Sequence, residues 1–312
     1  MNRRNLLQSV ASVVAGAGII GADPDATWGA TATSEPPTPA SNPPNHFIEI
    51  RDGVSLFYKE WGTGTPVLFV NSWGMTTQLW QYQMVDLCSR GFRCIAYDQR
   101  GHGRSSDPGC GFEYDTFADD LAQVIEKLDL HNITLVGHSV GCGVIARYVT
   151  RHGASRVSRV VMIAPTLPFM LKTPDNPNGV DESQLEQLRA IWKKDLPKWF
   201  GDNARSFFVA ETPQAMLDWA VTMGLQASLK ALVDFNHSAT QADFREELTK
   251  FNIPTLIIHG AADTSALLDF TGRRTAKLIP NCQLKVYEGA PHGLMFTHIE
   301  RLNADLLAFL KA

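Results

Sequence analysis

The sequence has 312 residues, of which 44% are hydrophobic and 19% charged, a composition that suits one sizeable folded domain with an elaboration. Its formal net charge of −4 leaves no broad basic surface, so we do not expect nucleic acid as a partner. No apolar run approaches the roughly 20 residues of a membrane-spanning helix, so we expect no stable membrane insertion.

The first 44 residues differ in kind from the rest of the chain. Arg3 and Arg4 precede a weakly hydrophobic stretch of Ala, Gly and Val, and residues 30–32 (Ala-Thr-Ala) have the small-x-small form of a cleavage site. We predict a twin-arginine-like export signal at residues 1–32, followed by a Pro-, Ser- and Thr-rich linker at 33–44. The protein is then expected in the periplasm, or in the cytoplasm if the signal is not used; a disordered tail is the alternative.

Short apolar runs recur through the remaining chain, with helix-length intervals between most of them. From the third run on they are continuous and apolar, the pattern of a parallel sheet covered on both faces, and the first two flank a two-residue hairpin turn at Asp52-Gly53. Apolar residues spaced by three and four predict a helix within residues 116–130. The expected strands cover residues 47–50, 54–60, 66–70, 92–97, 133–136, 157–163, 254–258 and 283–287.

The alternation of strands and helices is interrupted between residues 166 and 252. Two apolar stripes at helical spacing run through this segment. We predict a helical cap at 166–252, inserted between core segments 45–165 and 253–312 and covering the edge of the sheet where strand ends collect and ligands bind. Its Trp and Phe residues are expected mostly in the core, and any that face the site would form an apolar pocket. The stripes are Leu185, Leu188, Trp192, Leu196 and Trp199, and then Leu217, Val221, Leu225 and Leu232.

The Gly-His-Ser-Val-Gly motif at residues 137–141 follows an expected strand and precedes a helix-like stretch. A G-x-S-x-G motif in this context presents its serine on a turn so sharp that glycine is needed two positions before and two after it. Ser139 is therefore the candidate nucleophile.

A serine hydroxyl needs a base to take its proton, and the base must be held in the right orientation. Asp263 follows the seventh expected strand and His292 the eighth, in the chain order Ser, Asp, His that suits this arrangement. We predict that His292 is the general base and that Asp263 orients it. Asp269 and Asp98 are the competing carboxylates, although Asp98 is expected to brace a loop below the site.

Several further segments carry a family resemblance that covers the chain from about residue 46 to residue 312. The chain resembles the cofactor-free haloperoxidases and related esterases of the α/β-hydrolase superfamily. The resemblance implies an eight-stranded, mostly parallel sheet with helices on both faces, a helical cap, a Ser-His-Asp triad and no prosthetic group. The matching segments are residues 96–106 (AYDQRGHGRSS), 114–121 (YDTFADDL), 137–141 (GHSVG), 171–177 (LKTPDNP) and 289–293 (GAPHG).

One loop departs from this pattern. Where most relatives have His-Gly after the third strand, residues 71–74 read Asn-Ser-Trp-Gly, which is similar to 3-oxoadipate enol-lactonases. This loop and the residue after the nucleophile each supply a backbone amide to the oxyanion hole. By position we assign Trp73 and Val140, and the loop donor could equally be a residue adjacent to Trp73.

Three functions are compatible with these residues. The first is hydrolysis of a small carboxylic ester or lactone through an acyl-serine intermediate, and the apolar cap predicts a largely neutral small-molecule substrate. The second is perhydrolysis, in which peroxide replaces water and the site acts as a cofactor-free haloperoxidase. The third is a non-catalytic ligand-binding module, because this fold also hosts receptors. No metal site is expected, since no histidine pair has metal-ligand spacing with carboxylates nearby.

Overall fold

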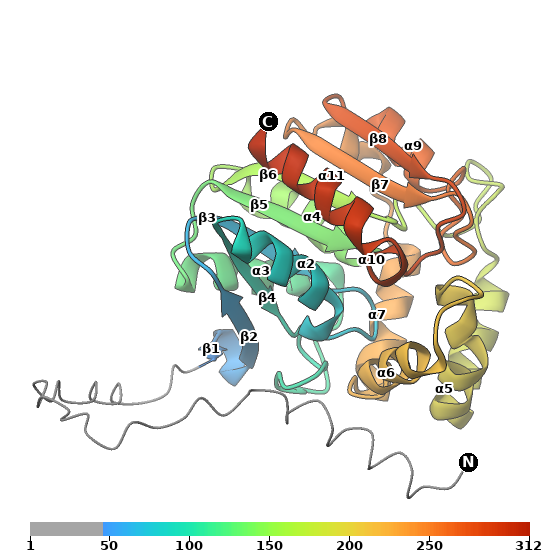
Figure 1. The fold of residues 1–312 in the computed structure, drawn as a ribbon. Coiled ribbons are helices and arrows are strands. Elements are labelled where there is room, and N and C mark those ends of the chain that lie inside the picture. The colour runs from blue at the N-terminus through green and yellow to red at the C-terminus, as the bar shows by residue number, and fades with distance from the viewer. Residues whose placement is uncertain (1–45) are drawn as a thin grey trace, which may run out of the picture. The chain divides into compact units, whose positions relative to one another are not determined.

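A computed structural model describes residues 46–312 of the chain, and the export signal and linker predicted at 1–44 lie outside the described residues. Its strands are β1 (Phe47–Glu49), β2 (Ser55–Trp61), β3 (Thr65–Val70), β4 (Phe92–Tyr97), β5 (Ile133–His138), β6 (Val157–Ile163), β7 (Thr255–Gly260) and β8 (Cys282–Tyr287). They form one eight-stranded sheet in the order β1-β2-β4-β3-β5-β6-β7-β8 (Figure 1).

The sheet begins antiparallel and continues parallel. β1 pairs antiparallel with β2 and β2 with β4, whereas every pair from β4 through β3 to β8 is parallel. Parallel strands covered on both faces are apolar without alternation, and all residues of β5 and β7 are buried. The predicted mostly parallel, eight-stranded sheet is confirmed, with each strand within two residues of its expected bounds.

The connection between β1 and β2 is longer than the predicted two-residue turn. The N–H of Ile50 donates to the carbonyl of Val54 at 2.9 Å, so the loop consists of the three residues Arg51–Gly53. Asp52 and Gly53 have φ angles of 62° and 70°, the left-handed values that their sequence indicated. The prediction therefore identified the bend correctly and missed one residue of its length, because Arg51 joins the turn.

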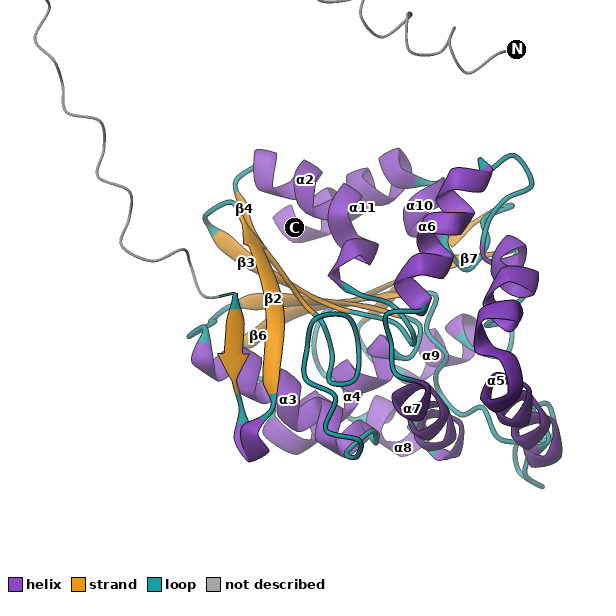
Figure 2. Ribbon diagram, turned by 90° about the horizontal axis from the view of Figure 1, so that it is seen from below, coloured by secondary structure: helices purple, strands orange, loops and turns teal. Residues whose placement is uncertain are grey.

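Helices cover both faces of the sheet (Figure 2), as predicted. On one face lie α3 (Tyr114–Lys127), α4 (Gly141–His152), α8 (Arg245–Thr249) and α9 (Gly272–Leu278). On the other face lie α2 (Gln81–Ser89), α10 (Leu294–Thr297) and α11 (Ile299–Lys311).

Alternate residues of β3 divide between the two apolar cores. Leu68 and Val70 pack in the core beneath α3 and α4, whereas Val67 and Phe69 pack in the core beneath α2 and α11. The helix expected within 116–130 is α3, which ends at Lys127 because Asp129 adopts a φ of 45°, outside the helical region.

Between β6 and β7 the chain leaves the sheet and forms α5 (Glu182–Asn203), α6 (Gln214–Gly224) and α7 (Leu229–Gln241). These helices lie together at the end of the sheet where β7 runs into its loop (Figure 1). The first predicted stripe lies on α5, where Leu185, Trp192 and Leu196 are buried and the other two residues are partly buried. The second was wrong as a single helix: α6 ends at Gly224, Leu225 is 43% exposed, and Leu232 belongs to α7.

Helix α5 is kinked in its middle. Asp195 has φ −158° and ψ 79°, two residues before Pro197, which lacks an N–H and cannot continue the preceding turn. The Asp195 carboxylate accepts a hydrogen bond from the N–H of Lys198 at 3.0 Å, which caps the second half of the helix. α5 is thus two shorter helices joined at a fixed bend.

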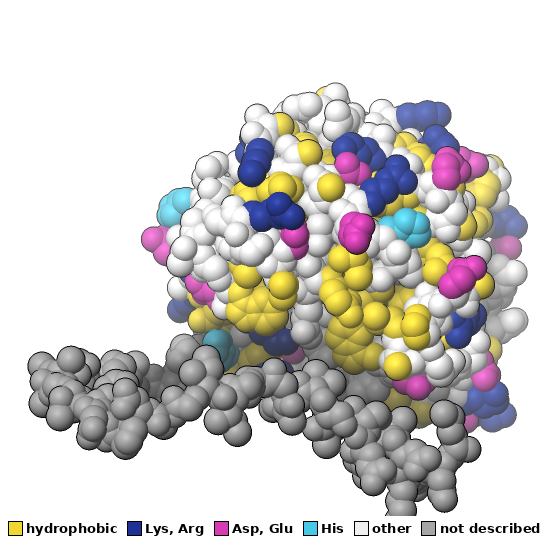
Figure 3. All heavy atoms as spheres, viewed as in Figure 1, with side chains coloured by type: hydrophobic (Ala, Val, Ile, Leu, Met, Phe, Trp, Pro, Cys, Tyr) yellow, Lys and Arg dark blue, Asp and Glu magenta, His cyan; other side chains and the backbone are white. Residues whose placement is uncertain are grey.

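The surface is mixed in character. On the face in Figure 3, basic and acidic side chains are interspersed among apolar and neutral ones, with no continuous field of one sign. In the described part of the chain, no helix is long and apolar enough to cross a membrane. All five cysteines of the sequence lie in this part, and all five are free thiols.

Two glycines allow a paired test of the packing. Gly201 is an exposed residue of α5 with nothing within 4 Å of an added Cβ, so Gly201→Ala should raise the free energy of unfolding by about 0.5–1 kcal/mol. A Cβ on Gly260 would lie 2.1 Å from the carbonyl oxygen of Ala290, so Gly260→Ala should lower it by about 1–3 kcal/mol. Urea denaturation measures both free energies of unfolding. If the two variants changed that free energy in the same direction, the packing at these two glycines would be contradicted.

Candidate active site

Ser139 sits on a strained turn between β5 and α4. Its φ is 54°, a left-handed value that is rare outside glycine, and its N–H donates to the carbonyl of Ile163 at 2.9 Å. A Cβ at Gly141 would lie 2.5 Å from the carbonyl oxygen of Asn71, and one at Gly137 would lie 2.8 Å from the side chain of Ile145. The two glycines are thus required by close contacts on both sides of the serine.

The structure brings His292 and Asp263 into direct contact. The Nδ1 of His292 donates to Oδ2 of Asp263 at 2.6 Å, and both side chains are buried. The other carboxylate oxygen accepts from the N–H groups of Ser265 and Ala266, each at 2.8 Å. These bonds fix the carboxylate and leave Nε2 of His292 as the free ring nitrogen.

A second histidine supports the same carboxylate. The Nε2 of His259 lies 2.7 Å from the carbonyl of Ala266 and 3.2 Å from Oδ2 of Asp263, and both of these atoms can only accept. Its ring is fully buried against Gly272, where an added Cβ would lie 2.3 Å from Nδ1. This contact depends on how the loop after β7 folds back, so no local sequence pattern predicts it.

The environment keeps Asp263 ionised. Burial by itself raises the pKa of this carboxyl, but the facing His292, the hydrogen bonds from the two histidines and the N–H of Ala266 outweigh it. The net effect holds the pKa of Asp263 well below its usual range. Because the folded-state pKa is depressed, this group stabilises the fold above its unfolded pKa, and the contribution is lost only in strong acid.

The two competing carboxylates are engaged elsewhere. Asp98 accepts from the N–H groups of Thr77, at 2.6 Å, and Arg104, at 3.1 Å, so it braces the loops at the end of β4, as expected. Asp269 lies on the surface, where it pairs with Arg273 at 2.8 Å. Of the three carboxylates that the sequence left open, Asp263 is the one that contacts His292.

His138, the neighbour of Ser139, holds the backbone rather than facing the cavity. Its Nε2 lies 3.1 Å from the carbonyl oxygen of His292, and because a carbonyl only accepts, Nε2 carries the hydrogen. Complete burial, and then the nearby His292, lower the pKa of His138 well below its usual value, which keeps the ring neutral. These contacts give His138 a structural role beside the nucleophile.

Two backbone amides are available for an oxyanion. Within the described chain, the N–H groups of Trp73 and Val140 donate to no acceptor, and both residues border the same cavity as Ser139. The side chain of Asn71 ties the Trp73 loop to the carbonyl of Tyr97 at 2.7 Å, and the indole N–H of Trp73 reaches the carbonyl of Leu232 at 2.8 Å. This loop is therefore anchored both to the sheet and to α7.

His102 holds the same loop from below. Its Nδ1 donates to the carbonyl of Arg100 at 3.0 Å, which leaves Nε2 to accept the N–H of Gly74 at 3.3 Å. Burial lowers the pKa of His102, so the ring remains an acceptor at Nε2.

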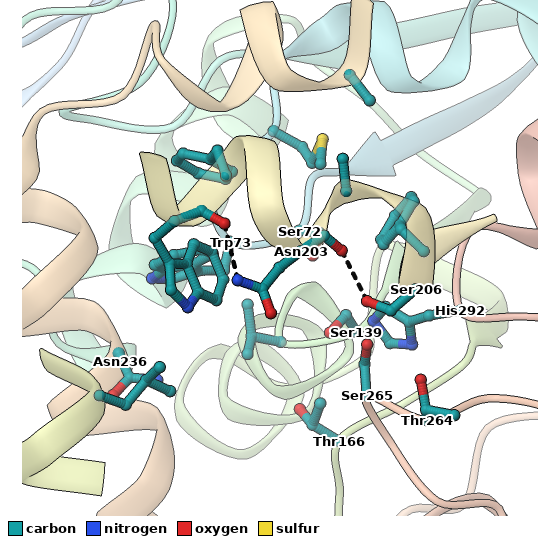
Figure 4. Close-up of a pocket in the computed structure, with 18 of the residues that line it drawn as sticks. Ser72, Trp73, Ser139, Thr166, Asn203, Ser206, Asn236, Thr264, Ser265 and His292 are labelled. Atoms are coloured by element: carbon teal, nitrogen blue, oxygen red, sulfur yellow. Dashed lines mark hydrogen bonds between the residues drawn. The ribbon is translucent and has the colours of Figure 1, made fainter. Parts of the chain in front are cut away.

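Ser139, Val140 and His292 open onto a cavity of about 410 Å³ beneath the cap helices (Figure 4). Aromatic side chains from the cap and the Trp73 loop form much of its wall, and the rings of Trp73 and Trp192 are 4.6 Å apart between centroids. The expectation that the cap aromatics lie mostly in the core holds, since Trp192, Phe200 and Phe208 are buried in the apolar clusters, and a group of aromatic residues also borders the cavity, as expected for an apolar pocket. That group is Trp192, Trp199, Phe200, Phe207 and Phe208.

The cavity is largely apolar, and the candidate base is the only titratable side chain among its described lining residues. No Asp, Glu, Lys or Arg of the described chain lines it, and its polar side chains are Ser, Thr, Asn and His292. Residues 46–312 hold no group of three His, Cys, Asp or Glu side chains arranged to bind a metal ion. A ligand that fills this space is therefore largely neutral and makes only a few hydrogen bonds.

Comparison with known proteins agrees with this geometry. The alpha/beta hydrolase fold family model matches residues 65–299. The chain is 40% identical to a non-heme chloroperoxidase of Kitasatospora aureofaciens over 271 residues, which covers 83% of this chain and 97% of that protein. It is 35% identical to a bifunctional esterase/perhydrolase of Acinetobacter calcoaceticus, over 85% of this chain and 99% of that one.

A similar solved structure and a more distant relative are also named as a haloperoxidase and a lactonase. The crystal structure of a bromoperoxidase from Bacillus anthracis superposes with a TM-score of 0.81 at 36% identity, over 84% of this chain and 97% of that one. A 3-oxoadipate enol-lactonase of Acinetobacter baylyi is 26% identical over 67% of this chain and 76% of that protein. Both resemblances seen in the sequence are thereby confirmed.

The contact between Asp263 and His292 can be tested without knowing a substrate. Asp263→Asn keeps the size of the side chain but no longer favours the His292 tautomer that has a free acceptor at Nε2, so labelling of Ser139 by a fluorophosphonate should slow on the order of 10³–10⁴-fold. The measurement is the labelling rate followed by mass spectrometry. Asp269→Asn is the matched control and should label at the original rate; equal rates for the two variants would contradict the assignment of Asp263.

Proposed function

The chain belongs to the alpha/beta hydrolase fold family, and we propose that it is a serine hydrolase of small carboxylic esters or lactones with Ser139, His292 and Asp263 as its catalytic residues. It is an enzyme of this family, whose relatives include haloperoxidases, an esterase/perhydrolase and an enol-lactonase. One observation carries the proposal: Ser139, on its strained turn, shares a cavity with the base His292 and with two amides that have no acceptor.

The first half of the proposed reaction forms an acyl-enzyme. The Oγ of Ser139 attacks the carbonyl carbon while Nε2 of His292 takes its proton, and the carbonyl oxygen becomes an oxyanion that accepts from the N–H groups of Trp73 and Val140. Each such donor stabilises the transition state by about 3 kcal/mol in comparable sites. Asp263 stabilises the imidazolium that forms, and His292 then protonates the departing alkoxide.

The second half releases the acid. A water molecule loses a proton to Nε2 of His292 and attacks the acyl carbon, and the tetrahedral intermediate collapses with return of the proton to Ser139. In a lactone the alkoxide stays attached to the acyl chain, so the product is a hydroxy acid. The apolar, uncharged wall of the cavity supports neutral esters or lactones over carboxylate- or phosphate-bearing substrates.

Ser139→Ala tests this function directly. Removal of the nucleophile should lower kcat for short p-nitrophenyl esters and simple lactones on the order of 10⁵–10⁶-fold, because no acyl-enzyme can form. Release of p-nitrophenol and titration of lactone ring opening measure the rates. Turnover that persists in Ser139→Ala would reject the acyl-serine mechanism, and an original chain that neither turns over nor labels with fluorophosphonate would favour a ligand-binding module.

A second activity of the same acyl-enzyme is perhydrolysis. The bifunctional relative at 35% identity supports it, although no residue of the site is dedicated to peroxide. Hydrogen peroxide would replace water, giving a peracid and free Ser139. The peracid then oxidises a halide ion away from the enzyme, yielding the carboxylate and hypohalous acid. Halogenation of a dye with peroxide, acetate and bromide should appear with the original chain and vanish in Ser139→Ala.

We also propose that the enzyme is exported by the predicted signal at residues 1–32 and acts in the periplasm. The support is the sequence alone, namely the Arg3-Arg4 pair and the Ala-Thr-Ala site at 30–32. Replacing both arginines by lysine should retain the protein in the cytoplasm, as measured by cell fractionation. A periplasmic protein that still carries residues 1–32 would contradict cleavage at that site.

A further inference from the structure

Asn236, on α7, presents an amide to the cavity in an orientation that its neighbour decides. The Oδ1 of Asn236 accepts from Nη1 of Arg189 at 3.1 Å. A guanidinium only donates, so the atom facing Arg189 must be the amide oxygen, and the NH₂ group must point the other way. Asn236 lines the cavity, and no described residue accepts from its Nδ2. The cavity therefore contains a hydrogen-bond donor that is held in place and unused.

The support for this amide is built into the packing of two cap helices. Arg189 is buried, and its Nη2 donates to Oε1 of Glu182 at 2.5 Å. The other oxygen of Glu182 accepts from Nε2 of Gln241 at 2.6 Å, which joins the N-terminal part of α5 to the end of α7. A buried guanidinium with fixed partners holds the Asn236 amide in a single orientation.

The position of Asn236 decides which part of a substrate it meets. Figure 4 shows Asn236 on the opposite side of the pocket from His292, with Ser139 beside His292. His292 must reach the leaving oxygen to protonate it, so the alcohol portion lies on the His292 side. The acyl portion then extends from Ser139 toward Trp73 and Asn236.

Resting on the proposed function, we propose that Asn236 is a specificity-determining residue, whose Nδ2 binds a second, uncharged acceptor oxygen in the acyl portion of the substrate. The class selected is an ester whose acyl chain carries an ether, ketone or hydroxyl oxygen beyond the reacting carbonyl. Because the cavity wall is largely apolar, this one hydrogen bond can discriminate between acyl chains of otherwise similar shape.

Asn203 provides a matched comparison within the same cavity. It also lines the cavity, but its Nδ2 already donates to the carbonyl of Trp199 at 2.8 Å, as Figure 4 shows. The main-chain carbonyl oxygen of Asn203 accepts a hydrogen bond from the hydroxyl of Ser206 at 2.7 Å. The amide donor of Asn203 is thus occupied by the protein, whereas that of Asn236 is not.

The test compares p-nitrophenyl esters of unbranched acids with esters of equal length in which one methylene, at the fourth, fifth or sixth acyl position, is an ether oxygen. The quantity measured is the ratio of kcat/KM for the ether ester to kcat/KM for its hydrocarbon partner. The ratio in each variant is divided by that of the original chain, so the intrinsic reactivity of each ester cancels. Asn236→Leu should lower the ratio about threefold to tenfold at the position that reaches Nδ2, the loss expected for one uncharged hydrogen bond.

Two further variants separate this role from a purely structural one. Asn236→Asp keeps an oxygen opposite Arg189 but replaces the donor by a second acceptor, so it should lower the ratio at least as much while the fold is retained. Asn203→Ala should leave the ratio unchanged, whatever it does to the rate with both esters.

A ratio that is the same in the original chain and in both Asn236 variants at all three positions would overturn the proposal. Equal losses with both esters, accompanied by a lower Tm, would also overturn it, because Asn236 would then only join α5 to α7. Failure of the original chain to cleave any of the esters or to label at Ser139 would instead reject the proposed function on which the inference rests.

Discussion

The contact between Gly141 and the carbonyl of Asn71 is the constraint on which the site depends. A single methyl group at position 141 would come within 2.5 Å of that oxygen, so the start of α4 and the loop after β3 touch backbone to backbone. Ser139 is fixed from the other side by the carbonyl of Ile163 in β6. The distance between the nucleophile and the two free amides is thereby set by three adjacent strands rather than by flexible side chains, which is how a site remains preorganised.

The charges of the site are confined to one corner of an otherwise apolar space. Asp263 is buried, yet two backbone amides and two histidines surround it, so its ionised form is better accommodated there than in water. The cavity beyond His292 carries no other titratable side chain. A neutral substrate can therefore enter without loss of a hydrated charge, and the only charge separation that develops lies between His292 and the oxyanion.

The sheet and the candidate triad could be predicted from local patterns, whereas the substrate pocket could not. Continuous apolar runs identified the parallel strands because burial on both faces leaves no alternation, and the loops after β5, β7 and β8 meet at one edge by topology. The cap follows no such rule. Leu225 continued an apolar spacing across a helix end, and the aromatic residues that line the cavity come from both halves of α5 and from the segment after it. The pairing of Arg189 with Asn236 joins two helices whose packing no local spacing encodes.

The bend in α5 lets one helix supply two parts of the cavity wall. Leu188 and Trp192 come from the half before Pro197, and Trp199, Phe200 and Asn203 come from the half after it. The two parts meet through their side chains, since the rings of Trp192 and Trp199 are 5.3 Å apart between centroids, and Trp192, Leu196 and Phe200 pack in one apolar cluster. A change of side-chain volume in one half is therefore felt directly by the other, so the two parts of the wall are expected to vary together rather than one at a time.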